Sequence, residues 1–188
     1  MMNEVHLCQK CFEKLNPVFK RFRFAGCKGL AIYHYDDYIR SLIYQLKTNM
    51  DVALAPVFLE RYLHLKYLYL NYVVLIAPSH ISHTNERGFK PVEGIFKIIG
   101  WNLLDCFVKS LSTKQVELRS EERKEVKKYI SLNEDVNLRD KKVLLVDDIM
   151  TTGSTIEAMV DLVRKRGAKR IEILVLAKNE LKEEMEKT

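Results

Sequence analysis

The chain has 188 residues, 47% of them hydrophobic, and its 31 basic and 25 acidic residues give a formal net charge of +6. This length suits one domain with a small appendage, and the hydrophobic content is ample for a buried core. No apolar run is long enough to cross a bilayer and the N-terminus lacks the apolar stretch of a signal peptide, so we expect a cytoplasmic protein without membrane insertion.

The N-terminal segment, residues 1–29, is basic and contains cysteines, and we expect it to be an appendage to a main domain of residues 30–188. Cys8 and Cys11 have the spacing of a zinc knuckle, and Cys27 follows near two glycines. A structural zinc ion normally has four ligands, so these three cysteines form an incomplete zinc site, for which His6 is the candidate fourth ligand. A metal-free remnant of such a site is the alternative.

Basic and aromatic residues alternate in residues 20–24, which read Lys-Arg-Phe-Arg-Phe. This alternation could contact the phosphates and bases of a single-stranded nucleic acid. The net positive charge favours anionic partners, although it is not a nucleic-acid signature by itself. A short strand with solvated basic side chains explains the pattern equally well, and we favour the strand.

Apolar patterns predict the next elements along the chain. Residues 30–35 predict a strand, residues 37–47 a helix with one apolar face, and residues 52–70 a second helical stretch rich in Leu and Tyr. Residues 72–78 predict a buried strand that ends in proline. Later in the chain, residues 92–99 predict a helix and residues 102–108 a strand. Cys106 in this apolar stretch is expected to pack as a small hydrophobic residue.

A polar loop follows the strand of residues 72–78. It contains Ser79 and Arg87, whose hydroxyl and guanidinium groups are suitable donors for an anion. His80 and His83 lie three residues apart, but no cluster of cysteines or carboxylates accompanies them. Local hydrogen bonding therefore explains these histidines better than metal binding does.

Residues 110–123 contain charged residues of both signs and end at Arg123. One interpretation is that the cations Lys114, Arg119 and Arg123 neutralise an anionic ligand. The alternative is a solvated, charged helix. For Arg123 we slightly favour the functional interpretation.

The most informative part of the chain is residues 143–155, Val-Leu-Leu-Val-Asp-Asp-Ile-Met-Thr-Thr-Gly-Ser-Thr. Four apolar residues predict a central parallel strand that is covered on both faces. Asp147 and Asp148 follow this strand, and apolar residues from Ile156 onward recur on one face of a helix. Residues 171–177 predict another buried strand. In such a strand–loop–helix–strand unit, the ligand crevice lies beyond the carboxyl end of the strand.

The loop between that strand and helix suits a sugar phosphate. Carboxylates accept hydrogen bonds from sugar hydroxyls, and backbone N–H groups at a helix start can hold a phosphate. Thr151, Thr152, Ser154 and Thr155 can add hydroxyl donors, and Gly153 lets the backbone approach a phosphate closely. An ordinary turn with capping residues is the alternative, but it explains one cap and not two adjacent carboxylates.

Residues 143–155 resemble the phosphoribosyl pyrophosphate (PRPP) signature of the type I phosphoribosyltransferases. The resemblance implies an α/β fold with a central, mostly parallel sheet flanked by helices. It also implies that Asp147 and Asp148 hold the ribose 2′- and 3′-hydroxyls at the catalytic centre. The loop of residues 151–155 would wrap the 5′-phosphate, and Mg²⁺ would bridge the ribose hydroxyls and the pyrophosphate.

The same resemblance implies roles for residues outside this run. Ser79 and Arg87 would bind the pyrophosphate, and Arg123 would act in catalysis by neutralising the pyrophosphate as the glycosidic bond breaks.

Further pieces of the chain resemble the ComF (late competence) branch of this family. They are the N-terminal cysteines, the Arg-Gly-Phe at residues 87–89, and the Gln-x-x-Leu of residues 115–118 followed by Arg123. Lys90 and Pro91 stand where that branch typically has Asn-Gln. The resemblance implies a role in DNA uptake during natural transformation, beside a competence helicase.

Two functions follow as hypotheses. The first is an enzyme that binds Mg²⁺–PRPP and transfers ribose 5-phosphate to a nitrogen nucleophile. The second is a non-catalytic accessory protein of the DNA uptake machinery that binds PRPP or another phosphate ligand and single-stranded DNA.

Overall fold

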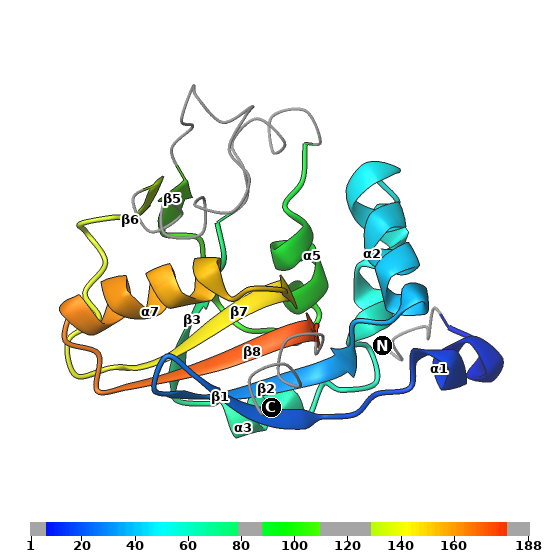
Figure 1. Cartoon of the computed structure of the whole chain (residues 1–188), viewed down its shortest axis with the longest axis horizontal. Coiled ribbons are helices and arrows are strands. Elements are labelled where there is room, and N and C mark those ends of the chain that lie inside the picture. The colour runs from blue at the N-terminus through cyan, green and yellow to red at the C-terminus, as the bar shows by residue number, and fades with distance from the viewer. Residues whose placement is uncertain (1–6, 79–87, 110–128, 180–188) are drawn as a thin grey trace, which may run out of the picture.

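The computed structural model describes residues 7–78, 88–109 and 129–179, and its centre is a six-stranded sheet (Figure 1). In spatial order the strands are β1 (Lys20–Phe24), β2 (Cys27–His34), β8 (Arg170–Lys178), β7 (Lys142–Met150), β3 (Tyr72–Ile76) and β4 (Leu103–Leu104). Every pairing is parallel except that of β1 with β2. The predicted α/β fold with a mostly parallel central sheet is thus confirmed.

Helices and one small sheet surround the central sheet. The helices are α1 (Gln9–Leu15), α2 (Asp37–Thr48), α3 (Leu65–Leu68), α5 (Pro91–Lys97) and α7 (Ser154–Lys165), with 3₁₀ turns η1 (Val52–Leu54) and η2 (Pro56–Phe58). The small sheet pairs β5 (Phe107–Lys109) with β6 (Ile130–Leu132). Figure 1 shows α7 along the sheet with β5 and β6 beyond it, and α2 and α5 at the end toward which β2, β7 and β8 point. No helix in the described ranges has the length and apolar character to span a bilayer.

The two faces of β7 bury two separate cores, as the alternation of a pleated strand requires. Val143 and Leu145 pack in the core that contains the apolar face of α7 and the residues of β5 and β6. Leu144 and Val146 pack in the core formed by α2, α5 and the segment between α2 and β3. All four side chains are fully buried, so β7 is a central strand covered on both sides, as its apolar sequence predicts.

Three predicted elements differ from the structure. The helical prediction for residues 52–70 is wrong, because this stretch folds as η1, η2 and the short α3. Val57, Phe58 and Leu59 are buried in succession, which one face of a long helix does not allow. The predicted strand of residues 102–108 splits into β4 and β5, and β5 leaves the central sheet to pair with β6. Strand β7 continues through Asp147 and Asp148, because β8 pairs with it as far as Met150.

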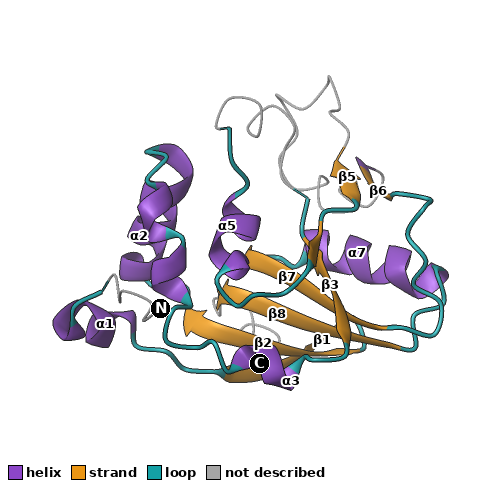
Figure 2. Cartoon of the chain, turned by 180° about the vertical axis from the view of Figure 1, so that it is seen from behind, coloured by secondary structure: helices purple, strands orange, loops and turns teal. Residues whose placement is uncertain are grey.

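The N-terminal segment contributes to the central sheet. Residues 20–24 form strand β1, as favoured from the sequence, and pair with β2. Strand β2 in turn pairs with β8. The predicted boundary between residues 29 and 30 therefore falls within β2, and the segment that precedes the sheet is the part that carries α1. Figure 2 shows α1 beside α2, away from the body of the sheet.

Candidate functional site

The two carboxylates at the end of β7 form the centre of the site. Each accepts a hydrogen bond from the next backbone N–H: Asp148 N donates to Asp147 Oδ1 at 2.8 Å, and Ile149 N donates to Asp148 Oδ1 at 2.7 Å. The alternation of Val143 to Val146 places Asp147 toward the α7 layer and Asp148 toward the layer of α2 and α5. The alternation changes after this point, because Ile149 packs with the α2 and α5 core and Met150 with the α7 core. The charged neighbours of each carboxylate therefore show which layer it faces.

Each layer supplies a lysine. From α2, Lys47 Nζ lies 2.5 Å from Asp148 Oδ2, and the Asp148 side chain in this pair is 8% exposed. From β5, Lys109 lies close enough for its charge to interact with Asp147, although burial lowers the pKa of this lysine. Sequence reasoning missed both residues. Lys47 occupies the last turn of a helix, where a basic residue is ordinarily explained by the helix dipole.

The electrostatic environment raises the pKa of Asp147. Burial is the largest cause, and the neighbouring Asp148 carboxylate adds to it. Lys47, the backbone N–H of Asp148 and Lys109 oppose the shift, and the resulting pKa is about 7. Asp147 and Asp148, which we call the acidic pair, can therefore hold or release a proton near neutral pH.

The loop after β7 has the features of a phosphate site. Thr151 and Thr152 are exposed, and the hydroxyls of Thr152 and Ser154 share a hydrogen bond of 2.8 Å. Gly153 is the N-cap residue of α7 and offers no side chain to cap the helix. The 12-residue α7 begins at Ser154, so its first N–H groups and the positive end of its dipole point at the loop.

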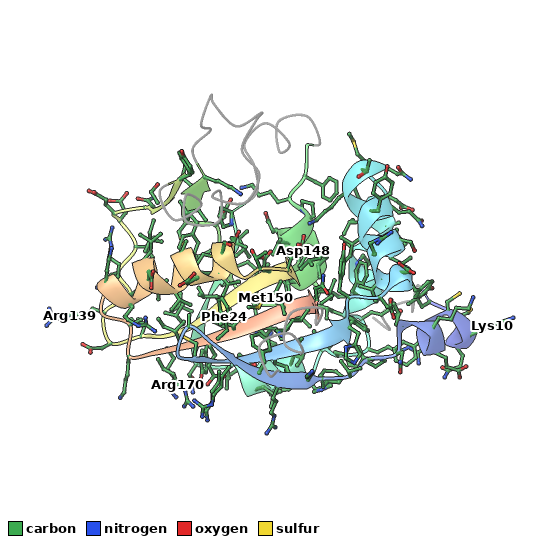
Figure 3. The ribbon with its side chains drawn as sticks, viewed as in Figure 1. Lys10, Phe24, Arg139, Asp148, Met150 and Arg170 are labelled. Carbon is green, nitrogen blue, oxygen red and sulfur yellow. The ribbon has the colours of Figure 1, made fainter. Side chains whose placement is uncertain are left out.

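The loop rests on the side chain of Phe24. Gly153 has a φ of +77°, and a Cβ placed on it would lie 2.4 Å from Phe24 Cζ and 2.9 Å from Met150 Cε. Figure 3 shows Phe24 and Met150 close together beneath the start of α7. Glycine is required here both by the left-handed backbone and by the space that the aromatic ring takes. This support from β1 was not predicted, because the two segments are distant in sequence.

Comparison with known proteins agrees with this geometry. A family model described as the phosphoribosyl transferase domain matches residues 106–188, which include the acidic pair and its loop. The competence protein ComFC of Streptococcus pneumoniae is 28% identical over 153 residues, which span 81% of this chain and 69% of that protein. Together, these two matches support a ComFC-like member of the type I phosphoribosyltransferase family.

More distant similarities cover shorter or more divergent parts of this ComFC-like chain. The adenine phosphoribosyltransferase of Solidesulfovibrio magneticus is 46% identical over 39 residues, only 21% of this chain and 23% of that enzyme. Among solved structures, a hypoxanthine phosphoribosyltransferase from Staphylococcus aureus has a TM-score of 0.43 at 18% identity, covering 71% of this chain and 66% of that one. A purine phosphoribosyltransferase from Pyrococcus horikoshii has a TM-score of 0.41 at 24% identity, covering 64% and 73%.

Several predicted site residues of the ComFC-like chain lie outside the described residues. Ser79, Arg87 and Arg123 are among them, so their roles in binding pyrophosphate and in catalysis stay predictions. Lys90, which replaces the first residue of the branch's Asn-Gln, forms an ion pair with Asp105, just before β5. The lysine that departs from the branch pattern therefore has a structural role, since it pairs with a carboxylate elsewhere in the fold.

The three cysteines predicted as zinc ligands are not brought together. Cys8 and Cys11 are close to one another at the start of α1, where hydrogen bonds from Cys11 lower the pKa of Cys8. Cys27 begins β2 and is buried beside Arg164 in the core under α7. Eight residues of strand, about 23 Å, separate this position from the end of β2 that leads to α2. Within the described ranges, no three His, Cys, Asp or Glu side chains could hold a metal ion.

A basic cavity of about 720 Å³ lies at the amino end of the strands. Its charged lining comprises Arg21, Arg23, Lys28, Arg170 and one carboxylate, Glu172, which pairs with Arg170. Its apolar lining includes Phe22, Leu68 and Tyr69. A second cavity of about 320 Å³ shares three of these cations and adds Arg164 and Lys169. Arg170 is the first residue of β8, whereas Asp148 lies near the end of β7, and Figure 3 shows the two labelled residues apart from one another. We call these two cavities together the basic groove, and they are separate from the carboxylates of Asp147 and Asp148.

Proposed function

We propose that this ComFC-like protein binds Mg²⁺–PRPP and transfers ribose 5-phosphate to a nitrogen nucleophile, releasing pyrophosphate. The observation that carries the proposal is the order of groups at the end of β7. Two carboxylates are followed, after Ile149 and Met150, by an exposed, hydroxyl-rich turn and the N-terminus of a 12-residue helix. One ribose 5-phosphate can contact both parts, because its hydroxyls suit the carboxylates and its phosphate suits the turn.

The protein's own groups would act by positioning and by charge. The turn and the first N–H groups of α7 would hold the 5′-phosphate, and Asp147 and Asp148 would accept hydrogen bonds from the ribose hydroxyls. Carboxylate and hydroxyl oxygens suit a hard cation. Mg²⁺ would supply positive charge that neutralises the pyrophosphate, and the acidic pair would hold this ion through the ribose hydroxyls. Fixing the sugar in this way would leave its reacting carbon open to a nucleophile from the side opposite the pyrophosphate.

The test removes the carboxylate charges without changing side-chain size. Asp147→Asn combined with Asp148→Asn should abolish PRPP binding in isothermal calorimetry with Mg²⁺ present, while circular dichroism shows a folded protein. Unchanged PRPP affinity in this double variant would disprove the role of the acidic pair. Pyrophosphate release, measured with a panel of nitrogen nucleophiles, separates a transferase from a protein that binds PRPP without turnover.

The basic groove favours a second candidate function, which is binding of single-stranded DNA. Arg23 and Lys28 are exposed and stand directly opposite each other on β1 and β2. Like charges in this arrangement repel one another unless an anion lies near both. Phe22, Leu68 and Tyr69 line the same cavity, and aromatic faces beside cations suit the bases and phosphates of a single strand. In this function the protein would handle incoming DNA beside a competence helicase.

A salt titration tests this second function. Single-stranded DNA should bind with an affinity that falls steeply with salt, and each phosphate contact adds about 0.7 to the logarithmic slope. Arg21→Ala combined with Arg23→Ala should weaken binding and lower that slope by about 1.4. Arg139→Ala, at an exposed position outside the groove, is the matched control. Absence of DNA binding at low salt in the unmodified protein would eliminate this function, and co-purification with a competence helicase would test the partner.

A further inference from the structure

The Asp148 carboxylate is held at both of its oxygen atoms. Ile149 N donates to Oδ1 at 2.7 Å, and the ammonium of Lys47 lies 2.5 Å from Oδ2. The Asp148 side chain is 8% exposed and that of Lys47 30% exposed, so the ion pair is shielded from much of the solvent. A carboxylate held in this way cannot rotate freely, and its orientation depends on a residue from another layer of the fold.

Lys47 reaches the acidic pair because of its place on α2. Ile39, Ile43 and Leu46 bury one face of this helix in the core. Lys47 follows Ile43 by one turn, which places its side chain at the edge of that face. A cavity of about 770 Å³ opens beside it and is also lined by Ile149, the residue directly after Asp148. Helix α2 therefore provides a wall beside the sugar-phosphate site as well as a cation within it.

The site needs a cation at this point. Two adjacent carboxylates repel one another and also repel a polyanionic sugar phosphate. Among the described residues, the charges that act on Asp147 are those of Asp148, Lys47 from α2 and Lys109 from β5. Of the two lysines, Lys47 forms a direct ion pair with the acidic pair. Its charge offsets that of one carboxylate.

We propose that Lys47 is a positioning residue of the sugar-phosphate site, whose ammonium fixes the orientation of Asp148 and balances the charge of the acidic pair for an anionic ligand. This inference rests on the proposed function for its ligand, PRPP. Its electrostatic part concerns the ligand-free protein and can be tested without PRPP.

The experiment compares three variants of the full chain. Lys47→Met removes the charge, Lys47→Arg keeps it, and Arg40→Met removes one charge from an exposed position on the same helix. Thermal unfolding first shows which variants fold, and Lys47→Gln, which also removes the charge, replaces Lys47→Met if Lys47→Met does not fold. Carbon-13 NMR then follows the Asp147 carboxyl group against pH without ligand, and calorimetry gives PRPP affinity between pH 6 and pH 8.

In Lys47→Met the pKa of Asp147 should rise, because the ammonium that opposes its protonation is gone. PRPP affinity should fall about tenfold or more, with the greatest loss at high pH, where both carboxylates carry charge. Lys47→Arg and Arg40→Met should remain close to the unmodified protein in both measurements. Equal effects of Lys47→Met and Arg40→Met would overturn the proposal, as would a Lys47→Met variant with unchanged PRPP affinity. If the unmodified protein fails to bind PRPP, the proposed function fails, and the titration of Asp147 still decides whether Lys47 acts on the pair.

Discussion

Replacement of Gly153 by alanine tests most directly whether the Phe24 ring packs tightly against the loop of residues 151–155. The residue has a φ of +77°, and a side chain in the left-handed region costs about 1–2 kcal/mol. The new methyl would also lie 2.4 Å from Phe24 Cζ and 2.9 Å from Met150 Cε, so the ring and the thioether must move. Overpacking of this kind costs about 1–3 kcal/mol. We therefore expect Gly153→Ala to lower the free energy of unfolding by about 2–5 kcal/mol.

Urea denaturation and thermal unfolding measure this loss. For a domain of this size, 2 kcal/mol corresponds to a fall in melting temperature of about 4–8 °C. Phe24→Leu supplies the second arm of a double-mutant cycle, because a smaller side chain removes the clash but leaves the backbone strain. Gly153→Ala should then cost about 1–2 kcal/mol in the Phe24→Leu background. An equal cost of Gly153→Ala in both backgrounds would show that the Phe24 ring does not press on Gly153, and would refute this account of the loop.

Three further predictions follow from buried groups. Asp147 has a raised pKa of about 7 against an ordinary value of 3.8, so between these values the folded protein holds the extra proton and loses stability as pH rises. Asp147→Asn should therefore increase the free energy of unfolding at pH 8 and not at pH 4, and a gain that is independent of pH would contradict this. Tyr33→Phe should cost about 1–2 kcal/mol in denaturation, because the buried hydroxyl donates to the Phe58 carbonyl at 2.7 Å, while Tyr67→Phe, 76% exposed, should have no effect. Gly29→Ala would place a methyl 2.3 Å from the Phe22 ring and should cost about 1–3 kcal/mol; full stability of this variant would mean that the ring can move away.

The acidic pair differs from an ordinary surface pair of carboxylates because of its surroundings. Its two members face different layers, and each layer supplies one lysine, Lys47 from α2 and Lys109 from β5. A ligand that contacts both carboxylates would therefore connect the layers around β7. This arrangement gives α2 a direct part in the site, even though the helix follows β2 and lies far from β7 in sequence.

Local sequence patterns were sufficient to predict the strand, turn and helix that make up the candidate site. Four apolar residues, two carboxylates and a glycine-containing turn before a helix occur within thirteen consecutive residues. Their geometry depends mainly on neighbours in the chain, since a strand, a turn and a helix start are local structures. The same holds for α2, which begins at the predicted residue and is capped by the Asp36 side chain accepting a hydrogen bond from Ile39 N at 2.8 Å.

Patterns without a clear period gave the errors. The stretch between α2 and β3 is rich in Leu and Tyr, but Pro56 and successive buried residues belong to 3₁₀ turns that pack over the sheet. Cys27 lies close to Cys8 and Cys11 along the chain, but β1 runs between them and places Cys27 at the end of the sheet away from α1. The short distance between these cysteines along the chain did not predict their distance in the fold, because an extended strand lies between Cys11 and Cys27.

The sequence by itself determined the α/β fold, the similarity to ComFC and the position of the proposed sugar-phosphate site at the end of β7. It did so because the strand, the carboxylates and the phosphate loop are contiguous. The tertiary structure decided which groups surround that site. Lys47 reaches Asp148 from α2, and Phe24 supports Gly153 from β1. Both contacts join segments about one hundred residues or more apart, and only the pairing of strands and the packing of layers around β7 brings such segments within reach.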